Sequence, residues 1–234
     1  MSRSCSRIFS ILLYCLSGLL LCIGLVLRFQ TLLPPALQLS GVLGICLSGY
    51  GGSFFLLRCL PRSAGPAVMR RTFFGMFLLY LALLISFTLL DPVFSRRAAL
   101  PHWTSETLSA YLSGSVNLVP FQTVRFFWEG WRDGSLSFRA MLLNLAGNLA
   151  AFLPFALFLP LLFPRLRRFS RFLLCTACIS LAIELLQFAM LTGACDIDDL
   201  LLNTAGAALG FAVFRIPPLK RVLAAATFQC PDNS

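Results

Sequence analysis

Six long apolar segments constrain the fold of this chain more than any other feature. About 20 apolar residues in a helix cross the ~30 Å hydrocarbon core of a bilayer. Lipid offers no partners to backbone polar groups, so segments that span it form helices or closed barrels, and runs this long and uniformly apolar indicate helices. The sequence therefore predicts an all-α polytopic membrane protein with about six transmembrane helices. These lie near residues 8–27, 36–57, 72–90, 141–163, 170–191 and 197–215.

The composition agrees with a membrane protein. The chain is 58% hydrophobic and only 12% charged, with a mean hydropathy of +0.84, whereas about a quarter of the residues of a soluble domain are charged. The first apolar segment is long for a signal peptide, and no small-residue cleavage site follows it. We therefore predict a retained first helix. The second segment is rich in glycine and serine, which favours either close helix packing or a break in the helix.

The distribution of basic residues predicts that both termini are cytoplasmic. Loops on the cytoplasmic side carry an excess of lysine and arginine. With the N-terminus inside, most of the 19 basic residues fall on that side: Arg3, Arg7, Arg58, Arg62, Arg70, Arg71, Arg165, Arg167, Arg168, Arg171, Arg215, Lys220 and Arg221. Topology and contact with anionic lipid then explain the net charge of +10. We expect membrane lipids as partners and no nucleic acid.

Cysteine and histidine give no indication of a metal or redox site. Most of the nine cysteines lie inside apolar runs, where a thiol acts as a small hydrophobic group. Cys175 and Cys178 have the spacing of a redox pair, but they fall within an uninterrupted apolar segment. His102 is the one histidine, so no second histidine completes a zinc site. We expect no metal and no cofactor.

A long amphipathic loop, residues 91–140, lies on the predicted outer side. Its second half carries Trp128 and Trp131 together with Phe126, Phe127 and Phe138. Aromatic residues gather at membrane–water interfaces. The loop therefore lies in the headgroup region as an amphipathic segment, or its aromatic residues only form an interfacial belt, and the sequence leaves both readings open.

Polar residues inside the last three apolar segments mark a candidate site. They are Asn144, Asn148, Glu184, Gln187, Asp199 and Asn203. Such residues are rare within a membrane and face the bundle interior or a cavity. With a rise of ~1.5 Å per residue, Asn148, Gln187 and Asn203 lie about 10 Å below the outer surface. We predict a shared polar pocket that opens outward. The alternative, interhelical hydrogen bonds without a pocket, stays open.

Several of these residues also have structural interpretations. Asp196 is placed to cap the sixth helix, with Asp199 three residues later as in a capping box. Gly206 and Gly210 are spaced for close helix packing. Glu184 has no basic residue within the last three segments to pair with, so a cationic partner would come from the outer loop. Candidates are Arg125, Arg132 and Arg139.

The order and spacing of the motifs resemble the VanZ-like family of bacterial membrane proteins. The matching pieces are Asn117-Leu-Val-Pro120-Phe121, Asn148 with Phe152-Leu-Pro154-Phe155, Glu184-Leu-Leu-Gln187-Phe188, Gly193 to Asp199, Asn203-Thr204, and Gly206 with Gly210. The resemblance covers roughly residues 73–215. It implies three parts: an N-terminal helix pair (1–71), a VanZ-like membrane domain (72–216) and a cytoplasmic tail (217–234).

The resemblance also marks individual residues. It points to Asn117, Pro120, Asn148, Glu184, Gln187, Asp196, Asp199, Asn203 and Gly206, to which we add Phe121 and Asn144 as candidate site residues. Asp198 stands at a position that the family pattern leaves variable, so it receives less weight. Ala156 stands where the family usually has glycine. Ala194 stands where many members have arginine, which removes a candidate counter-ion for the aspartates.

The function implied by the resemblance is one in the bacterial cell envelope. The member that gives the family its name contributes to teicoplanin resistance, so we expect a multi-pass protein of the cytoplasmic membrane that engages lipid, a cell-wall precursor or a lipoglycopeptide. One alternative is a membrane-embedded lipid or phosphoester hydrolase using Asp196, Asp199 and Glu184. Another is a small proton-coupled transporter. The sequence identifies no catalytic residue and no oligomeric state.

Overall fold

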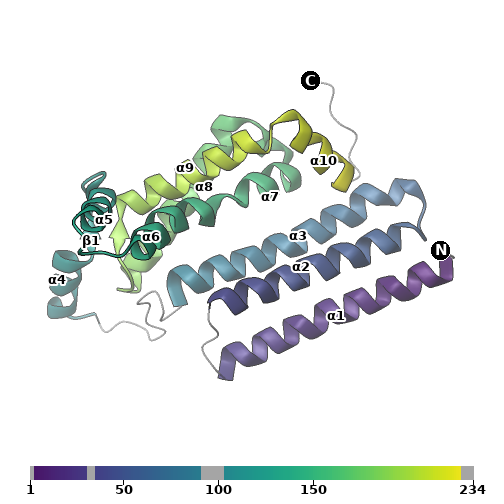
Figure 1. Ribbon diagram of the computed structural model, residues 1–234, viewed down its shortest axis with the longest axis horizontal. Helices are drawn as coiled ribbons and strands as arrows, with labels where there is room; N and C mark the ends of the chain where they lie inside the picture. Colours follow the sequence, from purple (N-terminus) through teal and green to yellow (C-terminus); the bar gives the residue numbers. More distant parts are fainter. Residues whose placement is uncertain (1–2, 31–34, 91–102, 228–234) are drawn as a thin grey trace. The chain divides into compact units, whose positions relative to one another are not determined.

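The computed structural model describes residues 3–30, 35–90 and 103–227 and is almost wholly helical (Figure 1). The chain forms two compact units, Met1–Leu83 with Pro217–Ser234, and Leu84–Ile216. We call them unit 1 and unit 2 and describe each by itself. The all-α architecture predicted from the apolar segments is confirmed. His102 and the first part of the outer loop lie outside the described residues.

Unit 1 contains four helices and a short 3-10 turn. They are α1 (Arg3–Gln30), α2 (Pro35–Leu57), η1 (Arg62–Ala64), α3 (Gly65–Ile85) and α10 (Pro217–Thr227). Figure 1 shows α1, α2 and α3 running side by side. The structural boundary at Leu83 reflects how the helices pack, whereas the predicted boundary at residue 71 marks where the family motifs begin. The domain organisation inferred from the sequence therefore stays a prediction.

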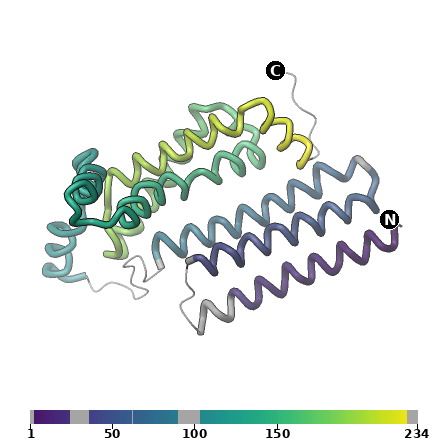
Figure 2. The backbone as a smooth tube through the Cα atoms, in the orientation of Figure 1, coloured from purple at the N-terminus to yellow at the C-terminus, as the bar shows by residue number. Residues whose placement is uncertain are grey.

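Small residues bring α1 and α2 together. A Cβ atom at Gly52 would lie 3.2 Å from the Tyr14 ring. The Ser10 hydroxyl donates to the Gly52 carbonyl at 2.9 Å, and the Tyr14 and Ser53 hydroxyls are bonded at 2.8 Å. Figure 2 shows α2 as one continuous tube. Of the two predicted roles of the small residues, close packing is therefore the one observed, and the helix does not break.

Unit 2 holds the remaining elements. They are η2, a π-helical turn (Ser86–Leu90), α4 (Ser105–Gly114), β1 (Val116–Asn117), α5 (Gln122–Arg132), α6 (Phe138–Phe152), α7 (Phe155–Leu162), η4 (Pro164–Arg167), α8 (Phe169–Ala189), β2 (Cys195–Asp196) and α9 (Ile197–Val213). Figure 1 shows α4 and α5 at one end of the bundle formed by α6 to α9.

Five described helices are long and apolar enough to cross a membrane. They are Arg3–Gly24, Ala36–Leu57, Gly65–Leu89, Phe138–Leu162 and Phe169–Ala189. The pair α9 and α10 gives a sixth if it counts as one broken span. On its own, α9 has 17 residues, a length of about 25 Å. The protein is thus a multi-pass membrane protein with five to six spans.

The fourth span consists of two helices because of proline. Pro154 has no backbone N–H and cannot continue the hydrogen-bond ladder of α6, which ends at Phe152 before α7 begins at Phe155. Pro160 lies inside α7 without ending it. The break in this span therefore lies at Pro154.

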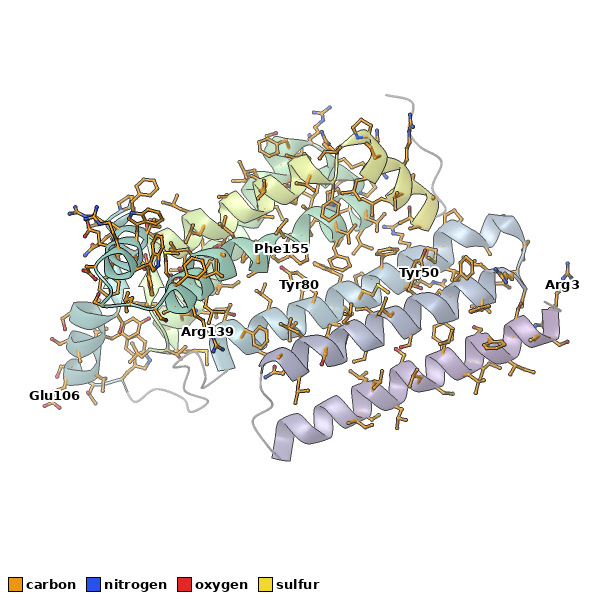
Figure 3. All side chains as sticks on the ribbon, viewed as in Figure 1. Arg3, Tyr50, Tyr80, Glu106, Arg139 and Phe155 are labelled. Carbon is orange, nitrogen blue, oxygen red and sulfur yellow. The ribbon has the colours of Figure 1, made fainter. Side chains whose placement is uncertain are left out.

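The core of unit 2 is aromatic, and α9 lies closely against α6. Phe152, Phe155 and Phe172 are fully buried, and Figure 3 marks Phe155 on α7. The Phe172 and Phe211 rings stack with centroids 4.7 Å apart. A Cβ atom at Gly206 would lie 2.0 Å from the Leu149 carbonyl oxygen. The predicted packing role of Gly206 is confirmed, since no larger residue fits there.

Two short strands join the outer loop to the start of α9. β1 pairs with β2 in parallel, with Val116 opposite Cys195 and Asn117 opposite Asp196. The Cys195 N–H donates to the Ser115 carbonyl at 2.8 Å. Nothing in the sequence pattern indicated this pairing, which brings two predicted site residues, Asn117 and Asp196, next to each other.

Candidate functional site

Asp196 joins four elements of unit 2. It is buried, and its Oδ1 accepts hydrogen bonds from the Asp198 backbone N–H at 2.8 Å and the Asn117 side-chain amide at 3.0 Å. Its Oδ2 accepts from the Thr123 hydroxyl. Its own backbone N–H donates to Glu184 Oε2 at 2.9 Å. Asp196 is therefore the predicted cap of α9, and it also ties α9 to β1, α5 and α8.

Asp198 caps a second helix, which the sequence analysis did not foresee. Its side chain is fully buried. Oδ1 accepts from the Phe121 N–H, and Oδ2 accepts from the N–H groups of Thr123 at 2.8 Å and Val124 at 3.1 Å. These are the donors that a cap residue of α5 itself would satisfy, but Phe121 makes no side-chain cap bond. Asp198 therefore has a structural role that its low weight as a site residue did not anticipate.

The turn before α5 has an unusual backbone. Phe121 adopts φ 66° and ψ 7°, a left-handed conformation that is rare for a bulky residue and persists only where its surroundings enforce it. The Asn117 side-chain oxygen accepts from the Val119 N–H at 3.0 Å within the same turn. Pro120 and Phe121 are exposed. Asn117 and Asp198 therefore fix the turn and aim the N-terminus of α5 at the carboxylate.

The exposed face of α5 is aromatic. Phe126 is 61% exposed and Trp128 51%, and the Trp128 and Trp131 rings meet edge to face at 5.1 Å. Arg125 and Glu129 form an ion pair at 2.8 Å on the same helix. Figure 3 shows side chains spreading outward around α5. The helix is amphipathic, as predicted for this part of the loop, and its position in the headgroup region stays a prediction.

Glu184 accepts a hydrogen bond from a backbone donor. Its carboxylate is only 4% exposed and receives the Asp196 N–H. Of the loop arginines considered as partners, Arg125 is engaged with Glu129, and Arg132 and Arg139 are exposed. Through the Asp196 N–H, Glu184 links α8 to the first residue of the α9 cap.

Asn148, Asp199 and Asn203 connect helix pairs and lie apart from the Asp196 bonds. The Asn148 side-chain amide donates to Asp199 Oδ1, which joins α6 to α9. The Asn203 amide donates to the Ser180 hydroxyl at 2.9 Å, which joins α9 to α8 one turn beyond Glu184. Asp199 and Asn203 thus point to different neighbours, as interhelical hydrogen bonds would require.

Gln187 and Asn144 each leave one polar atom unsatisfied. Gln187 is 1% exposed, and its Nε2 donates to the Thr88 carbonyl at 2.9 Å in the π-helical turn η2. Its Oε1, like the buried Asn144 Oδ1, accepts no hydrogen bond within the part of the chain that the structure describes. Neither residue joins the Asp196 network.

The sequence analysis missed Asp198, Thr123 and Ser180. The signal for Asp198 and Thr123 was the start of α5, where Pro120 and Phe121 offer no capping side chain to the first N–H groups of the helix. These groups are left to water or to a distant acceptor. Ser180 gave no such signal, because serine in an apolar helix commonly bonds to its own backbone.

The arrangement favours structural capping over metal binding. Both oxygens of Asp196 and of Asp198 already accept hydrogen bonds from protein donors. Among the described residues, no group of three or more histidine, cysteine, aspartate or glutamate side chains is arranged to hold a metal ion.

Cys195 provides a chemical probe of the network. Burial raises the pKa of its thiol, and the charges of Glu184 and Asp196 raise it further. We expect Cys195 to be alkylated slowly at pH 8, with a pH–rate midpoint above that of an ordinary thiol. Glu184→Gln removes one negative charge and lowers the thiol pKa, so alkylation at pH 8 becomes several-fold faster. Peptide-level mass spectrometry measures the rate.

The control for the Cys195 experiment is Glu129→Gln, on the exposed side of α5. It removes an equal charge away from the thiol and leaves the rate unchanged. Equal rates in wild type and Glu184→Gln would show that the Glu184 charge does not act on Cys195.

Comparison with known protein families assigns the chain. A family model described as VanZ/LLP1 matches residues 77–219, more than half of the chain. Comparisons with curated proteins and with solved structures found no match. The matched region contains the two capping aspartates, Asn117, Glu184 and α5, and it agrees with the resemblance carried by the motifs. The chain belongs to the VanZ/LLP1 family.

Proposed function

We propose that this VanZ/LLP1 membrane protein engages an amphiphile in the outer leaflet of a bacterial cytoplasmic membrane and thereby raises tolerance to teicoplanin-type lipoglycopeptides. The observation that supports this is the cap that Asp198 places on α5. Through it, the buried side chain of Asp198 holds an aromatic helix in one orientation. The site consists of α5 and the outward-facing polar network beneath it.

The chemistry of α5 suits an amphiphilic ligand. Exposed tryptophan and phenylalanine rings are stable where apolar chains meet headgroups, and rings held by a rigid helix lose little conformational entropy on binding. Teicoplanin carries a lipid tail that anchors in the outer leaflet, whereas vancomycin does not. Contact through α5 would therefore distinguish the two antibiotics, and a lipid-linked cell-wall precursor would offer the same combination of tail and polar head.

Expression of the protein in a susceptible Gram-positive host tests this proposal. We expect a larger increase in the inhibitory concentration of teicoplanin than of vancomycin. The double variant Trp128→Ala/Trp131→Ala loses most of this increase, because it removes the paired rings of α5. Trp103→Ala is the matched control: Trp103 is equally exposed but lies outside α5 and contacts Phe188. Equal protection against both antibiotics, or none, would refute the role of the lipid tail.

The hydrolase alternative receives less support from the geometry. A metal-dependent hydrolase needs carboxylate oxygens that are open to a cation. Of its three carboxylates, Asp196 accepts hydrogen bonds at both oxygens, and Asp199 Oδ1 and Glu184 Oε2 each accept one. Stoichiometric metal in the purified protein, together with turnover of a phospholipid, would restore that alternative.

A further inference from the structure

Five arginines gather at the end of unit 2 opposite to the caps of α5 and α9. We call them the arginine cluster: Arg165, Arg167, Arg168, Arg171 and Arg215. They belong to η4, to the start of α8 and to the residues just after α9. All five are exposed, and the sequence contains no acidic residue between positions 134 and 183 or between 200 and 231. The segments that carry the cluster therefore contain no acidic residue of their own.

The structure holds part of the cluster in a fixed arrangement. The Arg215 guanidinium lies 4.2 Å from the centre of the Phe211 ring, and its Nη2 donates to the Arg167 carbonyl. Phe211 is buried and stacks on Phe172. The Phe211 ring thus covers one face of the Arg215 guanidinium, and the Arg167 carbonyl accepts a hydrogen bond from one of its edges. Its remaining N–H groups are available in a defined orientation.

The guanidinium group of arginine suits a phosphate ligand. The planar guanidinium can donate two parallel hydrogen bonds to a phosphate, whereas lysine acts as a point charge. Arg168 and Arg171 also stand at the N-terminal end of α8, where the helix dipole disfavours cations. An anion at this position would relieve that repulsion.

Apolar side chains border the cluster. Phe163 is 43% exposed, Phe169 47% and Ile216 51%. Guanidinium groups next to exposed aromatic and aliphatic side chains match a lipid, whose phosphate and acyl chains are joined in one molecule. Binding of a soluble anion would require only the charges of the arginines and no apolar side chains beside them.

We propose that the arginine cluster binds the phosphate group of an anionic phospholipid in the leaflet that it faces, which the charge bias predicts to be the cytoplasmic one. The site is independent of α5 and of any ligand on the outer side. It would hold α7 and α8, which η4 connects, to the residues just after α9.

The test uses the full-length protein in nanodiscs of phosphatidylcholine with a minority of phosphatidylglycerol, followed by native mass spectrometry of the lipids that remain bound. We expect wild type to retain phosphatidylglycerol. The variant Arg168→Lys/Arg171→Lys/Arg215→Lys keeps every charge and loses the paired donors. Since each charge-assisted hydrogen bond lost weakens binding about tenfold, retention falls at least that far.

The matched control is Arg3→Lys/Arg7→Lys, two exposed arginines on the same predicted side in unit 1. It retains phosphatidylglycerol like wild type, and unchanged melting temperatures confirm that both variants fold. Equal retention in the cluster variant and wild type would reduce the effect to net charge and overturn the proposal. Displacement of the lipid by millimolar inorganic phosphate would also overturn it, because the site would then bind a small anion.

Discussion

Gly206→Ala is expected to destabilise the protein by about 2–4 kcal/mol, since overpacking a tight helix interface forces the backbones apart. The added Cβ atom would lie 2.0 Å from the Leu149 carbonyl oxygen and 2.8 Å from the Leu149 Cα. Both atoms belong to the backbone of α6, so no side-chain rotation relieves the contact. Unfolding of the purified protein in mixed detergent micelles, followed by circular dichroism, measures the change.

Gly147→Ala provides the matched control within α6. A Cβ atom there has no neighbour within 4 Å, and alanine in a helix is favoured over glycine by up to about 1 kcal/mol. This variant should equal or slightly exceed wild type in stability. If Gly206→Ala were as stable as Gly147→Ala, the close approach of α9 to α6 would be refuted.

Asp198→Ala is expected to release the N-terminus of α5 at a cost of about 2–4 kcal/mol, because it removes a helix cap and leaves buried donors unsatisfied. Three N–H groups, those of Phe121, Thr123 and Val124, lose their acceptor. The variant also removes the hydrogen bond from the Phe121 N–H, which helps to hold Phe121 in its left-handed conformation. Faster hydrogen exchange across Gln122–Arg132, with α8 still protected, would identify the loss as local.

Asp133→Asn is the control for this experiment. Asp133 follows the other end of α5, is exposed, and accepts from Ser135, two residues away. That local bond lowers the pKa of Asp133, but no distant element depends on it. Exchange in the first turn of α5 should not change. Equal protection of α5 in wild type and Asp198→Ala would show that the cap is not needed.

The sequence predicted the features that depend on local composition. The lengths of the apolar segments predicted the membrane spans. The position of Asp196 just before an apolar run predicted the cap on α9. The spacing of Gly206 and Gly210 predicted close helix packing, and the structure places Leu149 and Leu153 against these glycines. Each of these depends on residues within a few turns of one helix, so periodicity and residue type were sufficient.

The remainder depends on contacts between distant residues. Asn117 and Asp196 form a hydrogen bond although they are 79 positions apart in the sequence, and Thr123 and Asp198 do so at a separation of 75 positions. A two-residue strand has no periodicity to recognise, and an aspartate that caps a different helix looks like any acidic residue in a first turn. The separate partners of Asp199 and Asn203 could not be predicted either, since spacing along one helix does not reveal which neighbour each side chain meets.

The cap on α5 also has a consequence for biogenesis. The donors at Phe121 and Thr123 leave the ribosome at least 75 residues before their acceptor Asp198 does. During that interval α6 to α8 must be inserted while the start of α5 lacks its partner. Completion of the end of unit 2 that carries α5 is therefore coupled to arrival of α9. A nascent chain that stalls before α9 would carry this end in an incomplete form, which quality-control proteases can recognise.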